Sequence, residues 1–138
     1  MIPVLILSHG DLARELLVAA RNIDPHLGEA VVAVTLPWEV DSDAATKDLK
    51  RRVRELQGSE GVLILTDMFG GTATNLALPF LEPGKVEVVT GANLPMLVKL
   101  AALRDTDLDL HELAQRLAST GQKSIRLASE FLRRHTRE

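Results

Sequence analysis

The sequence of 138 residues contains no cysteine. This absence excludes a disulfide framework, a thiol nucleophile and a thiolate metal site. Of the four histidines, His26, His111 and His135 fall in predicted loops or helices, and no pair has the spacing of metal ligands. We therefore expect neither a metal ion nor a cofactor, and we interpret these three histidines as solvated surface residues.

A strong net charge and long apolar runs are also missing. The formal net charge of −3 does not indicate a protein that binds nucleic acid. The first apolar run, Ile2–Leu7, is too short for the core of a signal peptide or for a membrane span. We expect a cytoplasmic protein that does not insert into a membrane.

No linker, repeat or low-complexity tract divides the chain, and its length suits about one domain. We therefore predict a single domain over residues 1–138, with a core of about residues 1–130 and a tail over residues 131–138. The content of hydrophobic residues, 46%, is typical of a globular protein.

Short apolar runs alternate with longer segments of helical period. The predicted strands are Ile2–Leu7, Val31–Leu36, Val62–Thr66 and Lys85–Thr90. The first predicted helix is capped by Asp11 and ends before Pro25, and the second begins at Asp41 and stops at Gly58. The third runs from Thr72 or Ala73 to before Pro83, and the fourth begins near Pro95. Most of Leu108–His135 is also predicted as helix. Within the last segment, Lys123–Leu127 also alternates like an edge strand, and its pattern leaves helix and strand open.

This alternation predicts an α/β fold, namely a doubly wound, mostly parallel sheet with helices on both faces. In such sheets, ligands bind at the carboxyl ends of the strands beside a topological switch point. His9 follows the first strand, Trp38 the second and Asp67 the third, so all three are expected at this edge.

The residues at this edge suit the transfer of a phosphoryl group. Neutral histidine is nucleophilic near pH 7, so His9 can accept the group on one ring nitrogen while Asp67 orients the ring through the other. Gly70 and Gly71 allow close approach of the backbone to phosphoryl oxygens, and Thr72 and Ser8 can add hydroxyl donors. Magnesium is not required.

Each of these residues also has a structural explanation. A histidine after a strand is commonly structural, Asp67 can cap its own loop, and two glycines are more often a turn than an anion site. Thr72 is a common residue at the start of a helix. The prediction of a phosphoryl site therefore depends on their joint position at two strand ends.

Three segments stand out along the chain, namely VLILSHGDLARELL from Val4 to Leu17, GVLILTDMFGGTATNLA from Gly61 to Ala77, and TGANLPMLVKL from Thr90 to Leu100. Together they closely resemble the IIA domain of the mannose, fructose and sorbose family of the bacterial sugar phosphotransferase system. Their order and spacing agree with that family, and the resemblance covers about residues 1–130. It implies a phosphocarrier in which His9 receives a phosphoryl group from HPr and passes it to a IIB partner for sugar uptake.

The resemblance assigns roles to further residues. Asp67 matches the acid that orients the histidine, and Thr72 matches a hydroxyl residue that contacts the phosphate. Gly70 and Gly71 match loop glycines, Ser8 the hydroxyl residue before the histidine, and Phe69 an aromatic at the rim of the site.

The resemblance also implies an assembly. It predicts strand order 2-1-3-4, and a cytoplasmic homodimer in which Lys123–Leu127 forms a C-terminal antiparallel edge strand exchanged between subunits. The resemblance also allows association with a membrane complex of IIC and IID components.

Two positions depart from the family pattern. Ala73 stands where many members have proline, which leaves the phosphate loop intact but sets the start of the helix less rigidly. Trp38 and Glu39 follow Pro37 where many members have proline and glycine. Trp38 is either a contact that docks HPr or IIB, or a side chain that packs over the second helix.

Two other functions fit parts of the sequence. The first is a regulatory module, in which phosphorylation of His9 controls docking to another protein without transport. The second is a receiver-like domain phosphorylated on Asp67, which is disfavoured because Ser8 and His9 replace the acidic residues that would hold its metal ion. The sequence does not identify the sugar.

Overall fold

The computed structural model describes residues 1–136, so the last two residues of the predicted tail lie outside the described part. The strands are β1 (Val4–His9), β2 (Val31–Leu36), β3 (Val62–Thr66) and β4 (Val86–Thr90). The α-helices are α1 (Leu12–Ile23), α2 (Ser42–Leu56), α3 (Thr72–Ala77), α4 (Leu94–Ala102), α5 (Leu110–Lys123) and α6 (Ala128–Thr136). Two short 3-10 turns, η1 (Pro25–Leu27) and η2 (Leu78–Phe80), complete the described elements.

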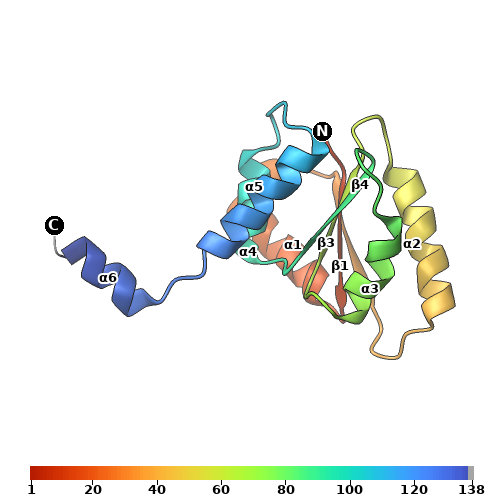
Figure 1. Ribbon diagram of the computed structural model, residues 1–138, viewed down its shortest axis with the longest axis horizontal. Helices are drawn as coiled ribbons and strands as arrows, with labels where there is room; N and C mark the ends of the chain where they lie inside the picture. The colour runs from red at the N-terminus through yellow and green to blue at the C-terminus, as the bar shows by residue number, and fades with distance from the viewer. Residues whose placement is uncertain (137–138) are drawn as a thin grey trace.

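The four strands form one sheet in the order β2-β1-β3-β4, and all three pairings are parallel. This confirms the predicted strand order and doubly wound α/β class. The chain moves from β1 outward to β2, returns to β3 on the other side of β1, and continues to β4 (Figure 1). The switch point therefore lies between the carboxyl ends of β1 and β3, which is where doubly wound sheets bind ligands.

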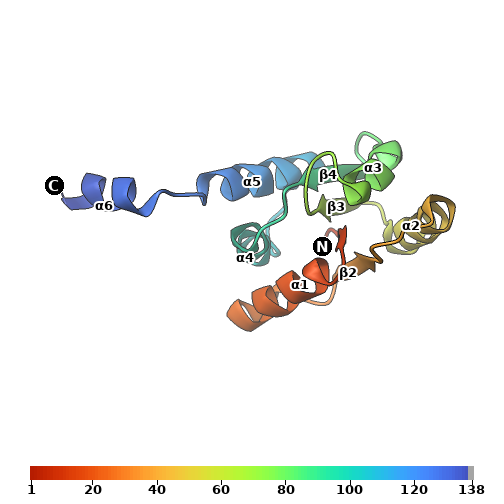
Figure 2. The same cartoon turned by 90° about the horizontal axis from the view of Figure 1, so that it is seen from below.

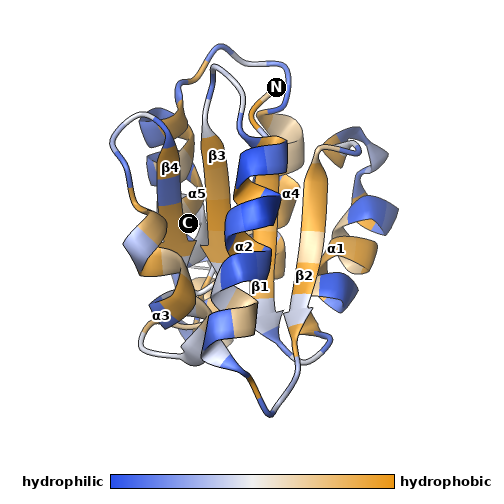
Figure 3. Ribbon diagram, turned by 90° about the vertical axis from the view of Figure 1, so that its right-hand side faces the viewer, coloured by the Kyte–Doolittle hydropathy of each residue, from blue (hydrophilic) through white to orange (hydrophobic). Residues whose placement is uncertain are grey.

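Helices cover both faces of the sheet because the central strands are apolar on both sides (Figure 2). On one face, Val4, Ile6 and Leu65 pack in a cluster with residues of α1, α4 and α5. On the other face, Leu5 and Ile64 pack in a second cluster with residues of α2 and α3. Figure 3 shows α2 in front of the apolar strands, with its hydrophilic side turned outward.

Helix ends agree with the sequence at some positions and differ at others. Asp41 is the N-cap of α2, and its side chain accepts hydrogen bonds from the amides of Asp43 and Ala44, as predicted. Asp11 occupies the N-cap position of α1, but the prediction that its side chain caps the helix is wrong. The Asp11 carboxylate instead forms an ion pair with Arg14, 2.8 Å away.

The C-terminal segment divides into two helices rather than one. α5 ends at Lys123, residues 125–127 belong to neither helix, and α6 lies well apart from the sheet (Figure 1). Within the described residues of this single chain, the segment Lys123–Leu127 pairs with no strand, so its exchange between subunits stays a prediction. Ile125 and Leu127 are exposed.

Candidate functional site

His9 and Asp67 meet at the switch point of the sheet. His9 is the last residue of β1, and Asp67 directly follows the last residue of β3. Because β1 and β3 are adjacent and parallel, the two side chains leave the same edge. The ring Nδ1 of His9 lies 2.7 Å from Oδ2 of Asp67, and the same oxygen accepts a hydrogen bond of 2.9 Å from the His9 amide.

Asp67 is held as a carboxylate. Its side chain is only 9% exposed, and this burial by itself favours the neutral acid. The amide and ring of His9 and the amide of Met68 donate hydrogen bonds that outweigh burial, so the pKa of Asp67 lies below its ordinary value. An ionised carboxylate can only accept hydrogen bonds, so the proton between the two side chains belongs to Nδ1 of His9.

This arrangement defines the free nitrogen of the ring. With the proton on Nδ1, a neutral imidazole carries its lone pair on Nε2. The His9 side chain is 23% exposed, and Nε2 makes no hydrogen bond to the described residues. The site thus presents a nucleophilic nitrogen to a partner from outside.

The loop from residue 68 to residue 71 approaches the imidazole closely. Gly70 has a φ of +81°, in the left-handed region that favours glycine, and Gly71 is the N-cap of α3. A Cβ added to Gly71 would lie 3.1 Å from Cε1 of His9. Thr72 is the first residue of α3, next to this loop, and its side chain is exposed.

Gly71→Ala should slow the predicted phosphorylation of His9 by about 10-fold, because the new methyl crowds a ring that Asp67 holds in place. The neighbouring Met68 side chain is exposed and can move aside, so the melting temperature should stay near that of the wild type. Gly58→Ala is the matched control, since an added Cβ there meets nothing within 4 Å. Equal labelling rates for the two variants would contradict the close approach.

The loops after β2 and β3 carry exposed apolar side chains at the edge of the sheet where His9 lies. Trp38, in the loop after β2, is 81% exposed, and its ring centroid lies 5.9 Å from that of His9 at an interplanar angle of 23°. The indole also packs over the backbone of Gly10. Phe69 and Met68 extend from the loop after β3 and are both exposed. The structure therefore places Trp38 beside the imidazole rather than over α2, which leaves an apolar rim open to solvent.

Ser8 has a structural function that the sequence did not indicate. Its hydroxyl is buried, with the residue 1% exposed, and it accepts a hydrogen bond of 2.7 Å from the amide of Ala13 in the first turn of α1. Ser8 thereby caps the helix in place of Asp11. Because this oxygen is buried and already bonded to the Ala13 amide, the contact of Ser8 with phosphate stays a prediction.

Ser8→Ala should destabilise the protein by about 1–2 kcal/mol, because a buried amide at the start of α1 loses its acceptor. The predicted phosphorylation of His9 should continue at the wild-type rate. Urea denaturation followed by circular dichroism gives the free energy of unfolding, and radiolabelling gives the rate. Loss of labelling at unchanged stability would instead restore Ser8 as a phosphate contact.

Sequence reasoning missed two hydroxyls behind the loop. Thr66 and Thr74 are fully buried, and their Oγ1 atoms lie 2.6 Å apart. Thr74 also donates a hydrogen bond of 2.5 Å to the carbonyl of Met68. Threonine is common in strands and at helix starts, so no local pattern distinguishes these two residues.

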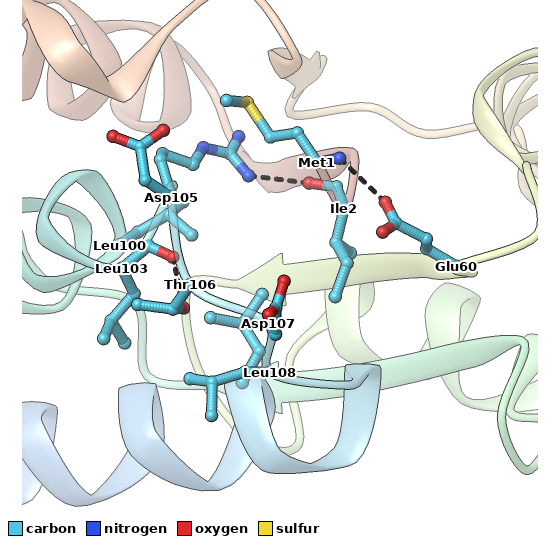
Figure 4. Close-up of a pocket in the computed structure, with 11 residues that line it drawn as sticks. Met1, Ile2, Glu60, Leu100, Leu103, Asp105, Thr106, Asp107 and Leu108 are labelled. Atoms are coloured by element: carbon cyan, nitrogen blue, oxygen red, sulfur yellow. Dashed lines mark hydrogen bonds and ion pairs between the residues drawn. The ribbon is translucent and has the colours of Figure 1, made fainter.

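The opposite end of the sheet holds a cavity of about 300 Å³ (Figure 4). Arg104 lines it and donates hydrogen bonds to the carbonyls of Ile2 and Leu27, and burial lowers the pKa of its guanidinium. None of the predicted site residues lines this cavity. Within residues 1–136 no cluster of histidine and acidic side chains could hold a metal ion, and no helix is long and apolar enough to span a membrane.

A family model described as "PTS system fructose IIA component" matches residues 3–118. The fructose-specific EIIA component of the phosphotransferase system of Bacillus subtilis is 31% identical over 135 residues, which cover 96% of this chain and 90% of that protein. The mannose-specific EIIAB component of Escherichia coli is 30% identical over 128 residues, and the match covers 91% of this chain but 39% of that longer protein.

Solved structures show the same fold. An EIIA component from Streptococcus agalactiae superimposes with a TM-score of 0.82 at 26% identity, covering 94% of this chain and 99% of that one. A mannose/sorbose-specific IIA subunit from Enterococcus faecalis gives a TM-score of 0.80 at 28% identity, covering 92% and 95% of the two chains.

Proposed function

Since the chain belongs to the sugar-specific IIA components of the phosphotransferase system, we propose that it is a phosphocarrier that holds a phosphoryl group on Nε2 of His9. The observation that carries the proposal is the bond of 2.7 Å between Nδ1 of His9 and Asp67, which leaves Nε2 free at the sheet edge. The donor is phosphorylated HPr and the acceptor is a IIB protein or domain.

Transfer begins when Nε2 attacks the phosphorus of the donor phosphohistidine. The new bond joins Nε2 to phosphorus, while the bond between phosphorus and the donor nitrogen breaks and returns its electron pair to the donor ring. Nδ1 keeps its proton throughout. The ring becomes positively charged as it attacks, and the Asp67 carboxylate stabilises that charge. The same steps in reverse pass the group to the acceptor.

The glycine loop receives the phosphoryl oxygens. Gly71 lies close to the ring and has no side chain to obstruct them, while Thr72 offers an exposed hydroxyl beside the loop. Gly70 gives the loop its left-handed turn. These groups act by position and by hydrogen bonding, so the reaction needs no cofactor.

The rim of Trp38 and Phe69 docks the protein partners. Exposed aromatic side chains around a reactive group bury readily against a partner and are common anchors of interfaces. We also place the protein in the cytoplasm as a homodimer that can associate with membrane IIC and IID components. The exposure of Ile125 and Leu127 supports the predicted exchange of this segment between subunits.

The test is to incubate the protein with phosphoenolpyruvate, the general phosphotransferase enzyme and HPr. We expect one phosphoryl group per chain, labile in acid and stable in alkali, which mass spectrometry maps to His9. A IIB partner should then discharge it. Labelling on Asp67, or none when HPr is fully phosphorylated, would contradict the proposal. If the phosphorylated protein passes its phosphoryl group only to a protein that takes no part in sugar uptake, the result would favour the regulatory module.

A further inference from the structure

Two consecutive hydrogen bonds, made by the hydroxyls of Thr66 and Thr74, lie behind the proposed phosphoryl site. Thr66 is the last residue of β3, and Thr74 lies in the first turn of α3. A threonine hydroxyl has one proton, and Thr74 donates its proton to the carbonyl of Met68. The contact of 2.6 Å between the two hydroxyls therefore has Thr66 as donor and Thr74 as acceptor. The bonds run in one direction, from β3 through α3 to the loop.

These bonds end on the peptide that adjoins the acid. The Met68 carbonyl accepts from Thr74, and the Met68 amide donates a bond of 2.9 Å to Oδ1 of Asp67. The other oxygen of Asp67 accepts from the amide and ring of His9. One short segment of backbone thus connects the buried hydroxyls to the carboxylate that holds the imidazole.

The loop has few other anchors. The side chains of Met68 and Phe69 are exposed, and an added Cβ on Gly70 would meet nothing within 4 Å. Among the described residues, the Met68 carbonyl accepts one further bond, a long one of 3.4 Å from the amide of Gly71. The short bond from Thr74 is therefore the strongest hydrogen bond that holds this carbonyl.

The geometry of Thr74 is unusual for a threonine in a helix. Such hydroxyls commonly bond to the carbonyl three or four residues earlier in the same helix. Thr74 bonds six residues back, outside α3. A buried pair of valines would fill similar space without the cost of desolvating two hydroxyls, so packing alone does not account for the pair.

We propose that Thr74 is a positioning residue for phosphoryl transfer, which fixes the Met68 peptide and through it the Asp67 carboxylate and the His9 ring. The inference rests on the proposed phosphocarrier function. Thr74 touches no reacting atom. Its hydroxyl restricts the rotation of the carboxylate, so that Nδ1 keeps its partner and Nε2 keeps its direction while a partner docks.

The test compares Thr74→Val, which keeps the shape and removes the hydroxyl, with Thr74→Ser, which keeps the hydroxyl. Thr106→Val is the matched control, because Thr106 donates a similar bond of 2.6 Å to the carbonyl of Leu103 at the far end of the sheet. Thr74→Val should lower the rate of His9 phosphorylation by phosphorylated HPr about 10-fold or more, while Thr74→Ser and Thr106→Val should stay near the wild type.

A second measurement does not need the donor. In the unphosphorylated protein, nitrogen and proton NMR of the His9 ring should show a protected Nδ1 proton, and Thr74→Val should make this proton exchange faster with water. Thr74→Ser should restore the protection. This rescue separates a positioning role from a purely structural one, which would appear only as a lower melting temperature.

The outcomes are distinct. Phosphorylation of Thr74→Val at the wild-type rate, with an unchanged Nδ1 proton, would overturn the inference. If the wild type itself accepts no phosphoryl group from HPr, the proposed function fails, and the NMR comparison still decides whether Thr74 holds the pair of Asp67 and His9. If Thr74→Val does not fold, Thr74→Ala removes the same hydroxyl with less bulk and should show the same losses.

Discussion

His9→Ala should accept no phosphoryl group from phosphorylated HPr, whereas the wild type should accept one per chain. The variant lacks the nucleophile, and no other described side chain at this edge presents a nitrogen held by a carboxylate. Incorporation of radiolabel from phosphoenolpyruvate, measured at several times of incubation, checks this expectation. Circular dichroism should show an unchanged fold, because His9 is the last residue of its strand and partly exposed.

The chain offers a matched control at the other end of the sheet. Nε2 of His26 lies 2.5 Å from Oδ2 of Asp105, so this pair also joins an imidazole to a carboxylate. Both side chains are exposed, and Asp105 lines the cavity at the end of the sheet opposite the glycine loop and Trp38. His26→Ala should therefore be labelled like the wild type. Labelling that survives in His9→Ala and disappears in His26→Ala would move the phosphorylated residue to His26.

Asp67→Asn should slow phosphorylation of His9 by about 100-fold or more while leaving the fold intact. The amide group of asparagine can donate a hydrogen bond to Nδ1, which favours the tautomer of His9 with its proton on Nε2. In that tautomer Nε2 has no lone pair with which to attack phosphorus. The amide also lacks the charge that stabilises the ring during attack. In this orientation the carbonyl oxygen of asparagine takes the place of Oδ1 and still accepts from the Met68 amide, so the loop should keep its place. Rapid-quench kinetics measure the rate.

Asp105→Asn is the corresponding control, because it changes the partner of His26 in the same way. A wild-type transfer rate in Asp67→Asn would remove the orienting role of Asp67.

Acid titration of protein stability adds a second readout for Asp67. The pKa of Asp67 is lowered in the folded protein, so its stabilising effect is present above the ordinary pKa of aspartate. The difference in the free energy of unfolding between the wild type and Asp67→Asn should therefore shrink as the pH falls through the lowered pKa that Asp67 has in the folded protein.

The sheet could be predicted well because its strands are buried on both faces. Runs of valine, isoleucine and leucine without polar alternation gave Val31–Leu36 and Val62–Thr66 with the bounds that the structure shows. The juxtaposition of His9 and Asp67 follows from parallel pairing of β1 with β3, since parallel strands bring their carboxyl ends to one edge. This part of the site depends on topology, which the alternation of strands and helices already indicates.

Hydrogen bonds between distant segments could not be predicted in the same way. Asp11 is a favourable N-cap residue, but Ser8 bonds to the amide of Ala13, because the tight turn at Gly10 brings the end of β1 back to the helix. Local preference does not decide which of two acceptors reaches an amide. The contact between Thr66 and Thr74 has the same origin, because it requires β3 and α3 to be packed together.

The position of Trp38 gives the protein an optical property. The sequence has one tryptophan and no tyrosine, so nearly all of its intrinsic ultraviolet fluorescence comes from an indole 5.9 Å from the imidazole that we propose as the phosphoryl acceptor. A phosphoryl group on that ring would bring about two negative charges next to the emitting side chain. The arrival and departure of the group, and the docking of a partner on the rim, can therefore be followed in real time by the emission of the unlabelled protein.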